Sequence, residues 1–340
     1  MRKAEFIITR LLSAVVVLFG VSIITFFLAR VIPSDPAAQY IGPHARPDQV
    51  AAVAHQLGLD RPLPIQYLRY MGAVLHGDFG ISIASKQPVL DEILSRLPDT
   101  LELIFAGMAI AIVVGITLGV ISARRRGRPI DFFSRTVSLF GISIPAYWLG
   151  LLLQLLFFRW LHWLPLSGES GSDLRFTHPL TPITHFMIVD AVLTRNWFAF
   201  RDVGLHLLLP ALTLAAFPAG LIARMTRGSM LEALEEDYIR TARAYGLPDR
   251  LITFGYALKN AIGPTLSVIG LSFAFALTGS FFVEIIFGWP GLGLFTVRSL
   301  LALDFPAIMG ITFLGAVAYI LINLIVDLAQ AWVDPRVALS

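Results

Sequence analysis

The sequence predicts an all-α integral membrane protein with six membrane-spanning helices, on three observations. First, 56% of its 340 residues are hydrophobic and only 14% are charged, whereas soluble domains average about 25% charged residues. Second, six apolar stretches approach the roughly 20 residues that a helix needs to cross a bilayer. Third, lysine and arginine gather in alternate connecting segments, a pattern typical of membrane helices.

The expected spans are residues 11–29, 103–123, 137–158, 203–223, 266–283 and 307–326. The first span could be a signal peptide, because three basic residues precede it. Its length and its lack of a small-residue cleavage site favour an anchor helix instead. The fourth span contains Pro210 and Pro218, which membrane helices tolerate. Pro145 should kink the third span.

The basic residues predict the orientation. They gather at the N-terminus, in the short loop 124–128 and in the loop 224–262. If six helices alternate, these three regions share one side, and that side should be cytoplasmic. Both termini are therefore expected inside. The loop 33–100 also carries basic residues, but charges in a loop of this length count little toward orientation.

Two sizeable pieces are expected outside the membrane. The first, 33–100, has helix-spaced apolar residues over 49–59 and 65–75, each stretch ending near a glycine, so it should be helical. The second, 159–202, is rich in Pro, Ser, Thr and Gly and predicts a loop with one short helix near 186–193.

The cytoplasmic loop contains the charged stretch "EDYIRTARAYGLPDR", residues 236–250. Residues 230–245 can form one continuous helix with Ser229 as its N-cap, acidic residues early and arginines late, as the helix dipole favours. Gly246 and Pro248 are typical of a helix end. A solvated helix that merely connects two spans would explain the same pattern.

Several kinds of chemistry have no residues to support them. The chain has no cysteine, so thiolate metal sites and cysteine nucleophiles are excluded. It has no G-x-x-x-x-G-K-[ST] or H-E-x-x-H motif, and its seven histidines are scattered without ligand spacing. No bound cofactor, metal site or catalytic residue is expected, so transport driven by ATP would need an ATPase on another chain.

The stretch "EDYIRTARAYGLPDRLITFGYALKNAIGP" resembles the cytoplasmic loop of the inner-membrane permease subunits of bacterial ABC importers. The loop's Glu-Ala-Ala positions correspond to Arg240, Thr241 and Ala242, and its glycine to Gly246. The departure from Glu-Ala-Ala is typical of the dipeptide/oligopeptide/nickel branch. The superfamily's later Leu-Pro falls at Leu258–Lys259, where the proline is absent.

Six further stretches resemble the "B" type permease of the same branch, in order along nearly the whole chain. They are "GLDRPLPIQYLRY", "GDFGIS", "RLPDTLEL", "GISIPAYWLGLLL", "FGWPGLG" and "LINLIVDLAQAWVDPR". A single short motif would be weak, but this ordered series is highly specific.

The resemblance implies a pore-forming subunit of the bacterial inner membrane. It would import dipeptides or oligopeptides that a periplasmic binding protein delivers, and it would not be an enzyme. Its partners would be a homologous second permease, two cytoplasmic ATPases that use ATP and Mg²⁺, and the lipid bilayer, but no nucleic acid. The domains would be an anchor (1–32), a periplasmic insertion (33–100) and a permease core (101–340) with the coupling loop 224–262.

In such importers a short coupling helix docks on the ATPase, and here the resemblance places it around 237–246. The coupling residues would be Asp237, Tyr238, Arg240, Thr241, Ala242, Arg243, Ala244 and Gly246. Arg240 and Arg243 would pair with acidic groups of the ATPase, and Gly246 would permit a close turn.

A second set of residues are candidates for the transport pathway or an outer gate: Glu102, Ser143, Pro145, Glu284, Trp289, Pro290 and Gly291. Ionisable groups in membrane segments are functional candidates by default. Glu102 and Glu284 could instead cap a helix or pair with outer-loop arginines, because both are near span ends. Trp289 also suits an interfacial anchor.

Two other functions fit the sequence less well. A carrier driven by an ion gradient usually has mid-membrane carboxylates and broken-helix repeats, and neither is clear here. A rhomboid-like protease would pair Ser143 with His206, but Ile144 follows the serine where rhomboids have glycine, and the expected depths of the two residues differ. The sequence does not choose among dipeptides, longer peptides, glutathione and nickel chelates, so peptide is the default substrate.

Overall fold

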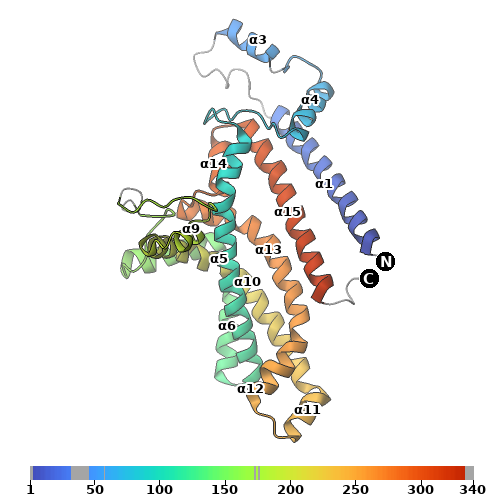
Figure 1. The fold of residues 1–340 in the computed structure, drawn as a ribbon, viewed down its shortest axis with the longest axis vertical. Helices are drawn as coiled ribbons and strands as arrows, with labels where there is room; N and C mark the ends of the chain where they lie inside the picture. Colours follow the sequence, from blue (N-terminus) through green and yellow to red (C-terminus); the bar gives the residue numbers. More distant parts are fainter. Residues whose placement is uncertain (1–2, 32–45, 57, 172–173, 175–176, 334–340) are drawn as a thin grey trace. The chain divides into compact units, whose positions relative to one another are not determined.

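The computed structural model describes the whole chain except residues 1–2, 32–45, 57, 172–173, 175–176 and 334–340 (Figure 1). Within these described residues the structure is helical and contains no strand; a single isolated bridge joins Ile81 and Pro88. The first part of the predicted outer insertion, 33–45, lies outside the described residues.

Most of the helices are long. The α-helices are α1 (Lys3–Val31), α3 (Pro47–Gln56), α4 (Leu63–Leu75), α5 (Val89–Arg124), α6 (Pro129–Ser143), α7 (Ala146–Leu153), α9 (Met187–Leu193), α10 (Trp197–Glu235), α11 (Asp237–Ala244), α12 (Asp249–Leu251), α13 (Leu258–Phe287), α14 (Leu292–Leu301) and α15 (Phe305–Val333). Two π-helical turns, η1 (Gln154–Trp160) and η2 (Ile252–Ala257), continue α7 and α12.

Five described helices are long and apolar enough to cross a membrane. A sixth span exists only if α6 and the α7–η1 segment count as one, and these are bent by 111°. The predicted kink at Pro145 is confirmed, but it divides the predicted span 137–158 into separate helices. Pro145 begins α7 as its N-cap, because it cannot continue the hydrogen-bonding pattern of α6.

The chain divides into two compact units. Unit 1 consists of the described parts of Pro98–Pro290 and Ile322–Ser340, and unit 2 of those of Arg2–Leu97 and Gly291–Leu321.

In unit 1, α10 is the central helix and packs against α6, α7, α9 and α13. Figure 1 shows α10, α13 and the later part of α5 side by side, with α11 and α12 at one end. Glycine lets α5 approach α10. A Cβ added at Gly119 would lie 2.6 Å from Thr226 Cβ, and one at Gly115 would lie 2.7 Å from Ile222 Cβ. Small residues allow such close contacts between membrane helices.

In unit 2, α4, the start of α5, α14 and the start of α15 share an apolar core that includes Phe79, Val89 and Phe295. The helices predicted over 49–59 and 65–75 are confirmed as α3 and α4, and the short helix predicted near 186–193 is confirmed as α9 of unit 1. Tyr70 of α4 has a buried hydroxyl, and burial together with Tyr67 raises the pKa of Tyr70 to about 12.

Candidate functional site

The charged cytoplasmic stretch forms a separate short helix. α10 continues to Glu235, so residues 224–235 of the predicted loop are helical. Glu236 then takes an extended conformation, with φ −68° and ψ 151°, and α11 starts at Asp237. The prediction of one continuous helix over 230–245 is wrong, and Ser229 is a buried residue inside α10 rather than an N-cap.

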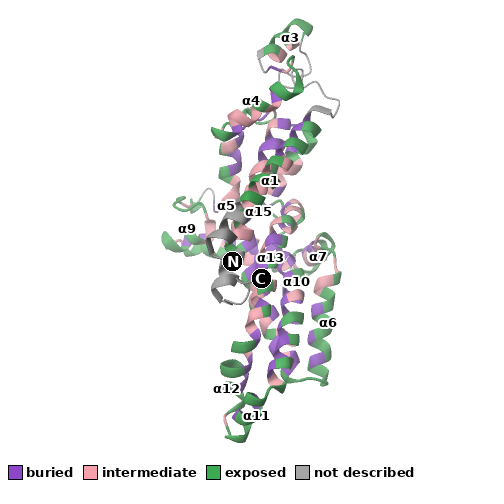
Figure 2. Cartoon of the chain, turned by 90° about the vertical axis from the view of Figure 1, so that its right-hand side faces the viewer, coloured by how far each residue is buried: buried purple, intermediate pink, exposed green. Residues whose placement is uncertain are grey.

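α11 has two distinct faces. Ile239 is 0% exposed and Ala242 is 5% exposed, and both pack in an apolar cluster with residues of α5, α10, η2 and α13. The charged and polar residues face outward, as the exposed colouring of α11 in Figure 2 shows. The exposed members of the predicted coupling set are Asp237, Tyr238, Arg240, Thr241, Arg243, Ala244 and Gly246. The apolar face thus fixes α11 to the membrane helices and leaves the polar face uncovered.

Gly246 ends α11 as predicted. Its φ of +70° lies in the left-handed region, which glycine adopts without a steric penalty. The Gly246 N–H donates to Arg243 O at 2.9 Å, and the Leu247 N–H donates to Ala242 O at 3.2 Å. A Cβ added at Gly246 would meet no atom within 4 Å. The position therefore needs glycine for its backbone conformation and not for lack of space.

The charges of α11 are held weakly within the chain. Arg240 donates to Asp237 at 2.9 Å, but the two side chains are 71% and 91% exposed. Exposed pairs of this kind contribute little to stability, so both side chains could change partners at small cost. Arg243 lines a cavity rich in arginine.

The two candidate pathway glutamates are buried in unit 1. Glu102 is 6% exposed, and its carboxyl group accepts hydrogen bonds from the N–H groups of Met187 and Ile188, at 3.2 and 2.6 Å. It therefore caps the N-terminus of α9, as one alternative proposed. Glu284 is 0% exposed and accepts a hydrogen bond from the Thr100 hydroxyl at 2.8 Å.

The turn before α9 is held by another carboxyl group. Asp190 is 1% exposed and accepts hydrogen bonds from the hydroxyl and N–H of Thr184 and from the N–H groups of Ile183 and His185. Burial alone would raise the pKa of Asp190, but these hydrogen bonds outweigh it and lower the pKa.

The "FGWPGLG" stretch spans the boundary between the units. Trp289, in unit 1, is 0% exposed, and its indole N–H donates to Asp99 O at 2.8 Å. The interpretation of Trp289 as an interfacial anchor is wrong, because an anchor at the membrane surface would be exposed. Pro290 ends the main segment of unit 1, and Gly291 is the N-cap of α14 in unit 2.

Ser143 and Pro145 lie beside a cavity of about 440 Å³ at the break between α6 and α7. Thr213 of α10 and Thr278 of α13 supply further hydroxyl groups to its wall, which is otherwise largely apolar. The structure thus gathers Ser143 and Pro145 at one site, while Glu102 and Glu284 lie elsewhere among buried polar contacts.

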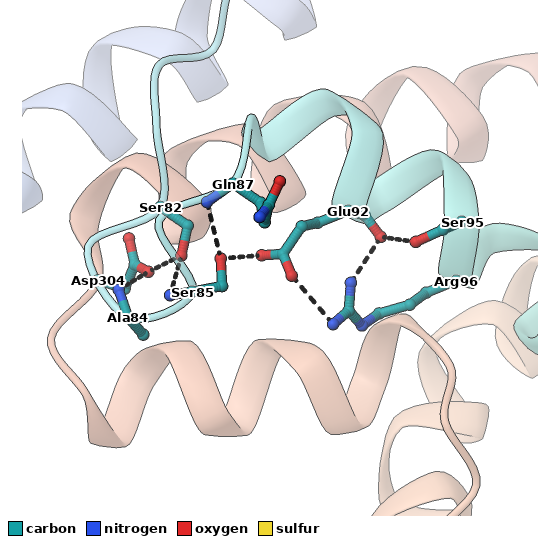
Figure 3. Close-up of polar contacts among 8 residues, drawn as sticks. All are labelled: Ser82, Ala84, Ser85, Gln87, Glu92, Ser95, Arg96 and Asp304. Carbon is teal, nitrogen blue, oxygen red and sulfur yellow. Dashed lines mark hydrogen bonds and ion pairs between the residues drawn. The ribbon is translucent and has the colours of Figure 1, made fainter.

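Asp304, a fully buried carboxyl group of unit 2, was not identified from the sequence. Figure 3 shows that Asp304 accepts hydrogen bonds from the Ser82 hydroxyl and, at 3.0 Å, from the Ala84 N–H. Its other carboxyl oxygen accepts from the Ala307 N–H at 3.2 Å, at the start of α15. Ser82 belongs to the quoted "GDFGIS" stretch. The only signal for Asp304 was its place before the apolar run that begins at Phe305, which fits an N-cap.

The same loop continues into a second set of contacts in Figure 3. The Ser85 hydroxyl donates to Glu92 at 2.8 Å, and Glu92 also accepts from Arg96 at 3.1 Å. Arg96 in turn lies 4.3 Å from the centre of the Phe295 ring. The loop between α4 and α5 is therefore bonded to Asp304 before α15 and to Glu92 of α5, and α5 contacts α14 through Arg96.

Two family models match this chain. Residues 115–339 match the "binding-protein-dependent transport system inner membrane component", and residues 3–104 match the N-terminal model of the same transport system. The chain belongs to this family. It is a multi-pass permease of the inner membrane and is not itself an enzyme, so the gradient-driven carrier and the rhomboid-like protease are excluded. Membership implies a binding protein and a separate ATPase as partners, and the permease itself binds no cofactor.

Individual relatives match over nearly the full length. The "Probable D,D-dipeptide transport system permease protein DdpB" of Escherichia coli (strain K12) is 45% identical, covering 95% of this chain and 94% of that protein. The "Di/tripeptide transport system permease protein DppB" of Pseudomonas aeruginosa (strain UCBPP-PA14) is 41% identical, covering 98% of both. The "Dipeptide transport system permease protein DppB" of Escherichia coli (strain K12) is 40% identical, again covering 98% of both.

Proposed function

We propose that this chain is the pore-forming subunit of an ATP-driven importer of dipeptides or short oligopeptides, and that α11 is its coupling helix. The substrate class is carried over from relatives that are 40–45% identical and named for dipeptides or di- and tripeptides. The assembly contains a second, homologous permease, two cytoplasmic ATPases and a periplasmic binding protein. The N- and C-termini and α11 are cytoplasmic, and the insertion 33–100 is periplasmic.

One observation carries the coupling assignment: Ile239 and Ala242 seat α11 in a cluster that also contains residues of α5, α10 and α13. A partner that pushes on the polar face of α11 would therefore push on three membrane-spanning helices at once. A flexible loop would absorb such a motion, whereas a helix packed on its inner face transmits it to the elements that change state.

The pathway assignment rests on the cavity at the α6–α7 break. Its hydroxyl groups on a largely apolar wall would hold a peptide weakly, as a conduit for many peptides requires. We assign Ser143 and Pro145 to this pathway. Glu102 and Glu284 hold α9 and α5 through their buried hydrogen bonds and are not part of the cavity wall, and Trp289, Pro290 and Gly291 remain candidates for an outer gate.

The test replaces Gly246 by tryptophan in the reconstituted importer. A Cβ at this exposed position meets no atom within 4 Å, so we expect the indole to project toward the ATPase and block docking. We expect peptide-stimulated ATP hydrolysis and uptake to fall at least about tenfold. Recovery of the ATPase during purification of the permease is measured in parallel.

The matched control is Gly168→Trp. Gly168 also has a positive φ, +88°, and a Cβ there would lie 3.8 Å from its nearest atom. Tryptophan at this position imposes comparable backbone strain, but in the loop 159–202, which we place on the periplasmic side. Normal assembly and import by Gly246→Trp would contradict the coupling assignment. That result would not affect the family membership, which rests on the sequence comparisons.

A further inference from the structure

A basic cavity opens in unit 1 where α5 ends. It has a volume of about 530 Å³ and lies between the loop after α5, the end of α10, and the segment containing α11, α12 and η2. Its polar wall is formed by Arg124, Arg125, Arg126, Arg128, Arg243, Glu235 and Asp249. We refer to it as the arginine cavity.

The arginine cavity has an excess of positive charge. Two of its five arginines are neutralised within the chain: Arg126 pairs with Glu235 at 2.7 Å, and Arg124 lies 3.8 Å from Asp249. Among the residues that the structure describes, Arg125, Arg128 and Arg243 have no acidic partner. Three guanidinium groups facing one concave site favour a ligand that carries phosphate oxygens.

An apolar surface continues directly from these arginines. Ile130, Phe132 and Phe133, on the first turns of α6, are 44%, 72% and 64% exposed. α5 is a membrane-spanning helix that ends at Arg124. The cavity therefore lies at the end of a span, where lipid headgroups meet water, and α6, which carries the exposed aromatic residues, starts directly after Arg128 of its wall.

We propose that the arginine cavity binds the phosphate headgroup of an anionic phospholipid, whose acyl chains lie along the exposed start of α6. Free inorganic phosphate would use the guanidinium groups but not the aromatic surface. An acidic segment of the ATPase would also leave that surface without a partner. A lipid is the single ligand that matches both, since basic pockets at the ends of membrane helices suit anionic headgroups.

The site also touches the coupling segment, because Arg243 belongs to α11. The inference does not depend on the proposed coupling role, since its test measures lipid binding rather than transport.

The test uses the complete importer, purified with its ATPases and placed in nanodiscs of phosphatidylcholine alone or of phosphatidylcholine mixed with phosphatidylglycerol. Native mass spectrometry counts the phosphatidylglycerol molecules retained on the permease, and a titration in detergent gives the apparent affinity. Parallel titrations use phosphatidylcholine and inorganic phosphate.

The variant is the double substitution Arg125→Gln/Arg128→Gln, at two exposed positions where loss of the fold is not expected. We expect the affinity for phosphatidylglycerol to fall about 25-fold, because each arginine near an anionic headgroup contributes about a fivefold factor. The matched control, Arg250→Gln/Lys259→Gln, removes the same charge from exposed positions outside the cavity and should bind as the unmodified importer does.

Three results would overturn the proposal. The first is equal affinity of the double variant and the control. The second is inorganic phosphate binding as tightly as phosphatidylglycerol, which would reassign the cavity to a free anion. The third is retention of phosphatidylglycerol only after the ATPases are removed, which would assign the cavity to an acidic surface of the ATPase. A difference between variant and control that shrinks at high salt would support the proposal, because salt screens exposed charges.

Discussion

Two aspartates stand at helix N-termini in different units of this molecule, and their surroundings are opposite. Asp304, before α15, is 0% exposed and accepts three hydrogen bonds, from Ser82, Ala84 and Ala307. Asp237, in the first turn of α11, has a side chain that is 91% exposed and is bonded to Arg240.

The comparison distinguishes a carboxyl group that stabilises the fold, that of Asp304, from one that is available to bind a partner, that of Asp237. Removing Asp304 would leave the buried Ser82 hydroxyl and the buried Ala307 N–H without an acceptor, and unpaired buried donors are costly. Removing Asp237 would leave donors that water can satisfy. The same residue type at the same kind of position thus has a structural role in unit 2 and, as we propose, an intermolecular one in unit 1.

The largest expected effect is that of Asp304→Ala. Two buried donors, the Ser82 hydroxyl and the Ala307 N–H, would lose their acceptor, so the free energy of unfolding should fall by about 4 kcal/mol. Thermal unfolding of the detergent-purified chain measures this loss. The control is Asp91→Ala, which removes an exposed carboxyl group from the first turn of α5. Equal stability of the two variants would contradict the structural role of Asp304.

The second prediction concerns how α11 is seated. Ile239→Ala would leave a cavity under α11, and such substitutions typically cost about 3 kcal/mol. The loss should be local and should appear as faster hydrogen exchange over residues 237–245. The control, Tyr238→Ala, truncates a neighbouring residue that is 37% exposed. Equal exchange rates in the two variants would contradict the inference that buried Ile239 holds α11 in place.

The smallest expected effect on stability is that of Asp237→Ala. The exposed pair with Arg240 should contribute less than about 0.5 kcal/mol, so thermal unfolding should be unchanged. Binding of the ATPase should nevertheless weaken several-fold, which copurification at graded salt concentrations measures. A large loss of stability would show that the two aspartates differ less than their exposures indicate.

Much of this molecule follows from local sequence patterns. The apolar runs predicted five of the spans, because a stretch of about 20 apolar residues is as long as a helix that crosses the bilayer. The ends of α4 and α11 were predicted from Gly77 and Gly246, and both glycines have positive φ. The ordered motifs were enough to place the chain in its family.

Other features depend on contacts between residues far apart in the chain. Ser82 and Asp304 are separated by 222 positions, and neither local sequence predicts that the two residues are in contact. The burial of Trp289 and the break at Glu236 have no local sequence signal either, and Pro145 predicted a kink but not its 111° size. Sequence alone determined which segments are helical and apolar, since those properties are local. Tertiary structure decided which polar groups are buried and which remain exposed for a partner, because burial depends on the neighbours that the fold supplies.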